Sequence, residues 1–375
     1  MTGPGRGGVV ETLRVWANVF RRIYFFNKMY PLSAIAEDAV LFPIDYIRNR
    51  STAVRNLTFA ITDKCNLRCS MCYFHTELAQ RRTLPLDLFQ KAIDGAAKSR
   101  PCVILSGGEP FLHPDLVAMV RYAKGKGLPV QIFTNGTLAG PDIADQLVAC
   151  GLDYIDFTLL GDERSHPAVA GAPASYRMLL QNLEYFAGHR GGTKVVLNYT
   201  ITPCSLDDIG HALQLAERFA LDGVRFQHYN FLRPAEFQAQ DRRMSALFGA
   251  AGPAVEIEDA ADLGGVAERL ISFMGTIRER GSQIPIQWAP TLTHDEIRNW
   301  YSADEFATCR KCLYPWRGIL IDAAGKLYPC SKIHLELGDL RHGDILSLWN
   351  GDRMREFRWG LKRGLFPACS RCCKL

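Results

Sequence analysis

The sequence predicts an α/β fold: a partial (β/α)6 barrel of the TIM type, followed by a small C-terminal domain built from a β-hairpin and helices. Between residues 57 and 230, six short apolar runs alternate with amphipathic segments of helical period, as in a parallel sheet with helical crossovers. Cysteine and glycine motifs follow the first two runs, at the strand ends where such barrels gather functional groups. Six of the twelve cysteines lie in the last 67 residues, outside this repeat, and indicate a second domain.

Composition narrows the class of protein. The 375 residues are 47% hydrophobic and 22% charged, which is ordinary for a globular chain of about two domains. A net charge of +5, from 44 basic and 39 acidic residues, gives no reason to expect nucleic acid as a partner. Twelve cysteines without a secretory signal indicate reduced thiols that serve metal, and hence a cytoplasmic protein. No uncharged apolar run is long enough to span a bilayer.

Residues 1–56 are expected to form an N-terminal helical extension. Residues 1–8 are rich in glycine and are expected to be flexible. Residues 11–30 place Leu13, Trp16 and Phe20 at helical spacing with arginines between them, so this segment could make peripheral contact with a membrane. The alternative is a helix packed on the protein's own body. Residues 31–50 continue as a second helix, interrupted by Pro43.

The barrel, residues 57–230, is read as alternating strands and helices. The expected strands are 57–62, 102–106, 129–134, 154–159, 194–201 and 223–228. The expected helices are Leu86–Lys98, Pro114–Lys126, Asp142–Cys150, Ala174–Ala187 and Leu206–Phe219. Residues 231–302 form a connecting helical region, with a loop over Gly249–Gly265 and a helix over Val266–Arg280. Residues 303–375 form the C-terminal domain.

Three thiols, Cys65, Cys69 and Cys72, follow the first strand with C-x3-C-x2-C spacing. Three thiolates on one loop can hold three irons of a [4Fe–4S] cluster and leave the fourth open to a ligand that is not protein. The alternative is a structural zinc site, for which His75 is the nearby candidate. The motif resembles the radical S-adenosylmethionine (SAM) superfamily. That resemblance implies that the open iron chelates SAM, and that reductive cleavage gives a 5′-deoxyadenosyl radical that abstracts a substrate hydrogen. It also implies a reducing partner such as flavodoxin or ferredoxin.

The turn Ser106-Gly107-Gly108-Glu109-Pro110 follows the second strand. Glycines at a strand end allow close approach of the backbone to a ligand. The resemblance implies that Gly107, Gly108 and Glu109 meet the amino group of SAM; the alternative for an isolated Gly-Gly is a plain tight turn.

Later strand ends supply weaker candidates for SAM contact. Where many relatives read S-L-D-G, this chain has Thr158-Leu-Leu-Gly161, so Thr158 is the expected contact and Asp162 a substitute for the missing acid. Asn198 matches a position that is often polar toward SAM in relatives; the alternative is a buried amide that satisfies backbone. Gln227, His228 and Tyr229 are expected to face the pocket, with a structural histidine as the alternative for His228.

The C-terminal run Cys312-x12-Gly325-x4-Cys330 resembles the opening of SPASM and twitch domains, in which a hairpin turning at the glycine brings two cysteines together. The resemblance implies that Cys369 and Cys372 complete four ligands of one auxiliary [4Fe–4S] cluster. A four-cysteine zinc ribbon is the alternative. Cys309 and Cys373 are spare thiols, either of which could replace a ligand, whereas Cys102, Cys150 and Cys204 are expected to be packing or incidental residues.

These observations predict a radical SAM enzyme, oxidoreductase-like or bond-forming, that modifies a peptide or natural-product precursor. One alternative is a lipid- or isoprenoid-modifying enzyme of the same chemistry at the membrane surface. Another is a non-catalytic iron–sulfur or zinc scaffold. No side chain is identified as a catalytic group beyond the cofactor sites.

Overall fold

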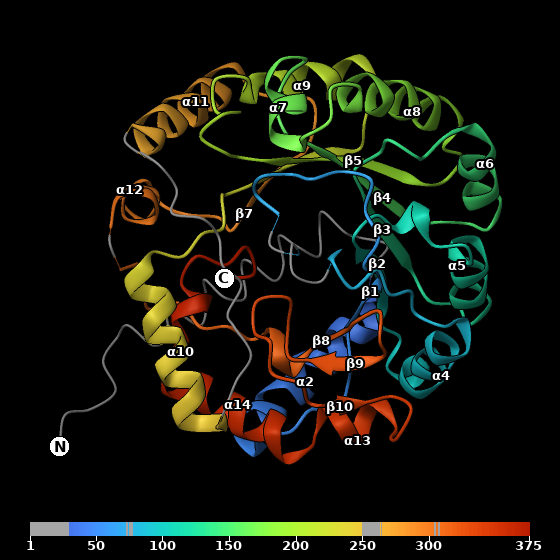
Figure 1. The fold of residues 1–375 in the computed structure, drawn as a ribbon, viewed down its shortest axis with the longest axis vertical. Coiled ribbons are helices and arrows are strands. Elements are labelled where there is room, and N and C mark those ends of the chain that lie inside the picture. The colour runs from blue at the N-terminus through green and yellow to red at the C-terminus, as the bar shows by residue number, and fades with distance from the viewer. Residues whose placement is uncertain are drawn as a thin grey trace.

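A single ten-stranded sheet organises the molecule, in the order β10-β9-β8-β1-β2-β3-β4-β5-β6-β7. The computed structural model describes residues 30–72, 74, 78–249, 263, 265–303, 305–306 and 308–375. Strands β1 to β7 are all parallel. They curve into an incomplete barrel with helices ranged along its outside (Figure 1).

The six predicted strands are present, with ends that differ by at most one residue from the prediction. They are β1 Asn56–Thr62, β2 Cys102–Gly107, β3 Val130–Thr134, β4 Tyr154–Leu159, β5 Lys194–Thr200 and β6 Gly223–Gln227. A further parallel strand, β7 Ile286–Ala289, pairs with β6 in the region that was expected to be helical. This strand is four residues long and lies between Pro285 and Pro290, so its sequence shows no alternation by which a strand could be recognised.

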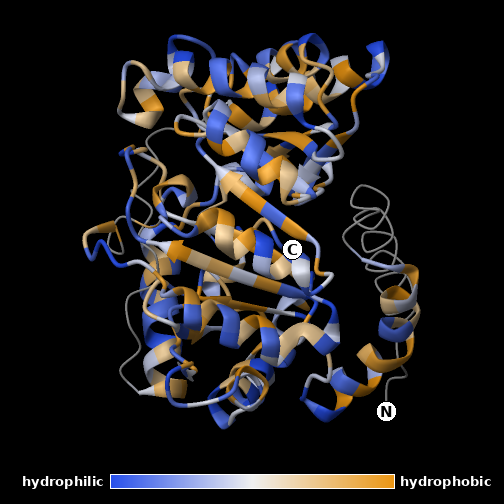
Figure 2. Ribbon diagram, turned by 90° about the vertical axis from the view of Figure 1, so that its right-hand side faces the viewer, coloured by the Kyte–Doolittle hydropathy of each residue, from blue (hydrophilic) through white to orange (hydrophobic). Residues whose placement is uncertain are grey.

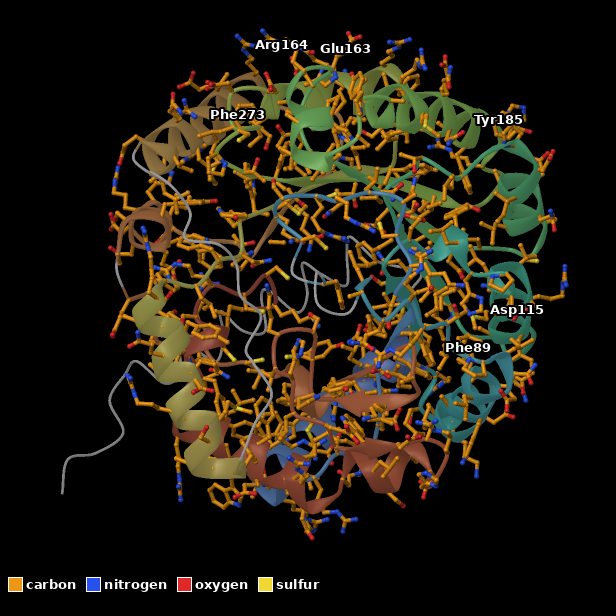
Figure 3. All side chains as sticks on the ribbon, viewed as in Figure 1. Phe89, Asp115, Glu163, Arg164, Tyr185 and Phe273 are labelled. Carbon is orange, nitrogen blue, oxygen red and sulfur yellow. The ribbon has the colours of Figure 1, made fainter. Side chains whose placement is uncertain are left out.

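Helices surround the incomplete barrel (Figure 1). They are α4 Leu86–Ala96, α5 Leu116–Gly125, α6 Pro141–Ala149, α7 Ser165–Ala170, α8 Ser175–His189, α9 Ile209–Arg218, α10 Pro234–Phe248, α11 Val266–Arg280 and α12 His294–Ser302. The five predicted crossover helices and the helix over Val266–Arg280 are thereby confirmed, whereas most of the predicted loop Gly249–Gly265 lies outside the described residues. Phe89 and Phe273 pack on Phe59 and Phe226 of the sheet, while Glu163 and Arg164 lie at the periphery (Figure 3).

Helix α2, Leu32–Arg48, runs through Pro43 without interruption, so the predicted break there is wrong. Proline removes one helical hydrogen bond, and the carbonyl that loses it belongs to Ala39, an exposed residue that water can reach. Arg55 at the start of β1 holds the helix through Asp38, at 3.0 Å. The predicted amphipathic segment 11–30 lies, except for Tyr30, outside the described residues. None of the described helices is long and apolar enough to cross a membrane.

The C-terminal region continues the barrel sheet. Strand β8, Gly318–Ile321, pairs in parallel with β1, and the predicted hairpin forms with β9, Lys326–Tyr328. Gly325 turns the hairpin at φ +83°, a backbone conformation that favours glycine. Strand β10, Gly338–Asp339, and helices α13, Ile345–Trp349, and α14, Asp352–Arg363, complete this region. Because β8 adjoins β1, the two cysteine-bearing parts of the chain share one sheet.

Candidate functional site

A cavity of about 1630 Å³ occupies the interior of the barrel. Cys65, Cys69 and Cys72 line it at the end of β1, and Cys373 lines it from the C-terminal region. The C-terminal residues lie within the ring of strands and helices (Figure 1). Two cysteine motifs that are more than 230 residues apart in sequence therefore border the same space.

The first cysteine loop is anchored on two sides. Backbone amides of Arg68 and Ser70 donate to carbonyl oxygens at the end of α7, at 3.1 and 2.9 Å. On the other side, the Asn66 amide donates to the Thr137 hydroxyl at 2.8 Å and accepts from Asn135 at 3.0 Å. The loop is thus held between the end of β3 and α7, with its three thiols half-buried at the cavity.

The electrostatics of these thiols favour a cationic ligand. Burial, together with the neighbouring Cys72 and Cys65, raises the pKa of the Cys69 thiol to about 12. Burial also raises the pKa of Cys65. Three crowded thiols cannot ionise easily alone, so a bound metal that deprotonates them would release protons and stabilise the loop.

The glycine turn after β2 sits directly on the backbone that leads into the cysteine loop. The Gly108 amide donates to the Thr62 carbonyl and the Glu109 amide to the Lys64 carbonyl, both at 2.7 Å. A Cβ on Gly108 would lie 2.2 Å from the Lys64 oxygen, and Gly107 has φ +127°. Only glycine allows this approach, and both glycines line the cavity.

Glu109 has a different position from the glycines. Its side chain is fully buried, and its carboxylate accepts from the Phe111 amide, the Thr134 hydroxyl and the Asn135 amide, at 3.1, 2.7 and 2.8 Å. Burial raises its pKa to about 7. Glu109 therefore braces the ends of β2 and β3 and is not among the residues that line the cavity. Its contact with SAM stays a prediction.

Thr158 and Asn198 both line the cavity, and they are register partners on β4 and β5. Asn198 is 6% exposed, and its Oδ1 has no hydrogen-bond partner among the described residues. Asp162, by contrast, accepts from the backbone amides of Arg164 and Ser165 in its own turn and does not line the cavity. The structure thus gives no support to Asp162 as a substitute for the missing acid.

The prediction that three consecutive residues at the end of β6 face the cavity is wrong for one of them, His228. Gln227 and Tyr229 line the cavity, but His228 does not. Side chains alternate along the chain here, so His228 points outward, where its Nδ1 meets the Tyr301 hydroxyl at 3.1 Å. Burial lowers its pKa to about 3. His228 is accordingly a neutral structural histidine.

The structure gathers Cys312, Cys330, Cys369 and Cys372. Cys369 and Cys372 are buried, and burial together with the charges of Cys312 and Cys330 raises the pKa of Cys369. Cys373 is hydrogen-bonded to Cys372 and faces the cavity, whereas Cys309 is exposed. In the described part of the chain, no three histidine, cysteine, aspartate or glutamate side chains are arranged to ligate a single metal ion.

A buried lysine, Lys332, and a half-buried one, Lys374, accompany this second set of thiols. Burial lowers the pKa of Lys332, while Cys372, Cys373 and Cys330 act in the opposite direction. Burial also lowers the pKa of Lys374, but Tyr314 and the thiols raise it overall. These cations offset the negative charge that four thiolates would bring into a buried site.

Sequence reasoning missed a polar network inside the barrel. Arg225 of β6 donates to Asp156 of β4 at 2.7 Å and to Gln287 of β7 at 3.1 Å, and Gln131 of β3 donates to Asp156 at 2.6 Å. Arg225, Gln131 and Gln287 line the cavity. The available signal was an arginine in the middle of an otherwise buried strand, GVRFQ.

The residues present fit an iron–sulfur cluster with SAM at the first site and a thiolate-ligated cluster at the second. The first site offers three thiols and no fourth within its motif, beside a glycine turn and a cavity large enough for a cofactor. The second offers four adjacent thiols with neighbouring cations.

Comparison with known protein families finds two domains. The model of the radical SAM superfamily matches residues 59–216, and that of the SPASM domain, an iron–sulfur cluster-binding domain, matches residues 307–373. The first domain implies a [4Fe–4S] cluster and SAM, and the second implies auxiliary iron–sulfur binding. These cofactors agree with those predicted from the cysteines, and the zinc alternatives receive no support.

Individual relatives match most of the length of the chain. An AdoMet-dependent heme synthase of Methanosarcina barkeri is 24% identical over 82% of this chain and 86% of its own length. A PqqA peptide cyclase of Xanthomonas campestris pv. campestris is 24% identical over 80% of this chain and 74% of its own. The crystal structure of Streptococcus suis SuiB bound to S-adenosylmethionine has a TM-score of 0.62 at 15% identity, over 92% of this chain and 77% of that one. This last likeness shows a common fold.

Proposed function

Because the chain belongs to the radical SAM superfamily and carries a SPASM iron–sulfur domain, we propose that this enzyme modifies a peptide or natural-product precursor inside the barrel cavity. When bound, the cluster and SAM supply the chemistry of the superfamily: an electron cleaves SAM, and the 5′-deoxyadenosyl radical takes a hydrogen atom from the substrate. The reducing partner is a protein such as flavodoxin or ferredoxin. The radical SAM core spans residues 57–230 and the auxiliary domain residues 303–375.

Each part of the cavity has its own task in this proposal. Cys65, Cys69 and Cys72 hold the SAM-binding cluster, on a loop fixed by α7 and by Asn66. The backbone at Gly107 and Gly108 leaves room for SAM, and the polar side chains of Thr158 and Asn198 orient it from β4 and β5. The barrel wall excludes water from the reacting atoms.

The observation that carries the proposal is that one cavity is lined by Cys65, Cys69 and Cys72 and also by Cys373, the neighbour of the second cysteine set. Its volume of about 1630 Å³ exceeds the range of about 300–1,000 Å³ usual for one small ligand, so there is room for substrate beside SAM. Cys312, Cys330, Cys369 and Cys372 would hold the second cluster, which would supply either an electron acceptor for the substrate or part of the wall of its pocket. Among the thiols of this region, Cys373 lines the cavity.

The substrate class rests on the relatives. One is named as a peptide cyclase, another solved structure of SuiB contains its precursor peptide SuiA, and several relatives are named as heme synthases. A peptide and a tetrapyrrole-like natural product are therefore both within the proposed class.

A second candidate is a lipid or isoprenoid substrate at the membrane surface, with residues 11–30 in contact with the membrane. The observation that favours it is the lower part of the cavity. There Ala34, Ile35 and Phe42 of α2 line the end opposite the cysteine loop, where the cavity reaches Asn56 at the start of β1. Asp38, Arg55 and Arg317 also line the cavity here, so an amphiphile with an apolar chain and a polar group would match this lining.

Anaerobic reconstitution tests the proposal. We expect about eight irons and eight sulfides per chain, as two [4Fe–4S] clusters require. With dithionite and SAM, the wild type should release 5′-deoxyadenosine, and Cys65→Ala, Cys69→Ala and Cys72→Ala should not. Intact SAM in the reconstituted wild type would favour the scaffold alternative.

The substrate is then sought by isotope transfer. Peptide and organic-solvent fractions from cells grown in deuterated medium are incubated with enzyme and unlabelled SAM. Deuterium in the released 5′-deoxyadenosine marks the fraction that holds the substrate. Transfer from the peptide fraction supports the first candidate, and transfer from the lipid fraction supports the second.

A further inference from the structure

Helix α2 presents a continuous apolar stripe to solvent. Leu32, Val40, Ile44 and Ile47 are 79%, 64%, 40% and 78% exposed, and their spacing of eight, four and three residues places them along one face. Helix α2 lies at the edge of the molecule, and parts of its ribbon carry the colour of hydrophobic residues (Figure 2). The opposite side of the helix carries Asp38 and Asp45, which pair with Arg55 and Arg317. The outer stripe therefore has no part in holding the helix to the barrel.

Helix α14 extends this stripe. Lys362 donates to the Ile47 carbonyl at 3.4 Å and lies over the rings of Tyr46 and Trp359, at 4.9 and 5.0 Å. Trp359 is 54% exposed, so it adds a large aromatic ring beside Ile47. Five of the six large hydrophobic side chains that are exposed in the described part of the chain belong to this α2/α14 surface: Leu32, Val40, Ile44, Ile47 and Trp359. Single exposed apolar side chains are ordinary, but such clustering marks an interaction site.

The rim of the α2/α14 surface is cationic. Arg48, Lys362 and Arg363 border Ile47 and Trp359, and within the described residues none of the three lies within 4 Å of a carboxylate. Of the exposed acids near this surface, Glu37 of α2 pairs with Arg55 at 2.9 Å and Asp352 of α14 pairs with Arg355, while Glu356 lies three residues before Trp359. The cations therefore outnumber the unpaired acids along the rim. The segment that precedes α2 repeats the same chemistry, since residues 11–28 intersperse arginine and lysine with tryptophan and phenylalanine.

We propose that the α2/α14 surface docks on an anionic phospholipid membrane. Apolar side chains with an aromatic ring and a rim of lysine and arginine are the features by which a peripheral helix enters the interface of a bilayer. The cations supply attraction to anionic headgroups, and the stripe supplies apolar area that the acyl region can bury. A protein partner of matching charge is a separate class, which the test below distinguishes.

Docking would place one end of the cavity at the bilayer. The side of α2 that faces the barrel lines the lower cavity, so the same helix contacts membrane on its outer side and cavity on its inner side. A substrate delivered from the bilayer would be an amphiphile with an apolar chain. This consequence rests on the proposed function, whereas the docking itself does not.

Vesicle sedimentation of the full-length chain, without SAM or reductant, tests docking independently of catalysis. We expect binding to vesicles of phosphatidylcholine mixed with phosphatidylglycerol, weaker binding to phosphatidylcholine alone, and release by high salt. The double variant Ile44→Asp with Ile47→Asp should reduce the partition coefficient at least about tenfold. Both side chains are exposed, so folding should be retained, and circular dichroism checks it. The matched control is Met178→Asp, at a 36% exposed apolar side chain on α8, which should bind as the wild type does.

Arg363→Glu adds a second test, because it leaves the apolar stripe intact and should weaken binding only to the anionic vesicles. Wild-type binding by the double aspartate variant would overturn the proposal and assign any membrane contact to residues 1–29. Equal binding to both vesicle types would overturn the anionic preference. If the wild type formed a dimer that the double variant abolished, and neither bound vesicles, membrane docking would be overturned. The α2/α14 surface would then be the contact with a second copy of this chain.

Discussion

The substitution Gly108→Ala tests how the glycine turn positions the cysteine loop. In the structure, the Cβ of an alanine here would lie 2.2 Å from the carbonyl oxygen of Lys64 and 2.6 Å from its carbon. Backbone cannot rotate away as a side chain can, and a normal contact requires these atoms to separate by roughly 1 Å. Lys64 immediately precedes Cys65, so the displacement passes into the cluster loop.

The expected cost follows from two hydrogen bonds. Both bonds, from the Gly108 amide to Thr62 and from the Glu109 amide to Lys64, are 2.7 Å long, and a shift of that size breaks them. A buried backbone group that loses its partner costs about 1–3 kcal/mol, so we expect a loss of about 2–6 kcal/mol in the free energy of unfolding. The first cluster should be lost before the second, and iron content should fall from about eight to about four per chain.

The measurements are iron content after anaerobic reconstitution and urea unfolding. Gly125→Ala is the matched control, because Gly125 lies at the end of α5, has no atom within 4 Å of the added Cβ, and should gain up to about 1 kcal/mol. If Gly108→Ala held about eight irons and unfolded within about 0.5 kcal/mol of the wild type, this account of the turn would be refuted.

Three further outcomes follow from the site. Cys330→Ala should lose the second cluster and the substrate product but keep some uncoupled release of 5′-deoxyadenosine; product formation at the wild-type rate, measured by mass spectrometry, would contradict this. Burial raises the pKa of Glu109 from 4.5 to about 7, so the folded state binds its proton more tightly than the unfolded state does. Its contribution to stability is present below pH 4.5 and lost as pH rises to 7, by about 3 kcal/mol. Urea unfolding from pH 4.5 to 8 should show this fall in the wild type and not in Glu109→Gln. Lys332→Met removes a buried cation beside the second set of thiols and should lower the potential of that cluster by on the order of tens of millivolts, as followed by redox titration with electron paramagnetic resonance; an unchanged or higher potential would exclude this role.

Much of the barrel could be predicted because its strands are buried on both faces and its crossovers are amphipathic. Such strands read as short apolar runs, and β1 to β6 were located to within one residue. What failed depends on contacts between segments that are distant in sequence. Strand β7 forms through its pairing with β6, and His228 faces outward because it meets Tyr301, 73 residues away.

The candidate site divides in the same way. Spacing alone indicated the cysteine sets and the glycine turn, because three thiols in eight residues and a Gly-Gly after a strand are local patterns. The role of Glu109 as a brace was not readable, since its partners Thr134 and Asn135 belong to the next strand end. The sequence shows Arg225 in a buried strand, but its role as the hydrogen-bond partner of Asp156 could be seen only in the structure.

The parallel pairing of β8 with β1, followed by the antiparallel return of β9, fixes the two cysteine sets at opposite edges of the same sheet. Both strands run in the same direction, so the hairpin turn after β8 and the cysteine loop after β1 emerge at the same edge of the sheet. Strand β9 runs back from this turn, so Cys330 after β9 and Cys312 before β8 lie at the other edge. Arg82 joins the two ends: it donates to Asp63 at 2.5 Å and lies 3.7 Å from Asp322 of the hairpin turn. A sheet held by backbone hydrogen bonds and closed by this arginine is rigid, whereas two domains on a linker would move relative to each other. The fold thereby fixes the distance between the site at Cys65 and the site at Cys330. A substrate held in the cavity between them would lie at a fixed distance from each site.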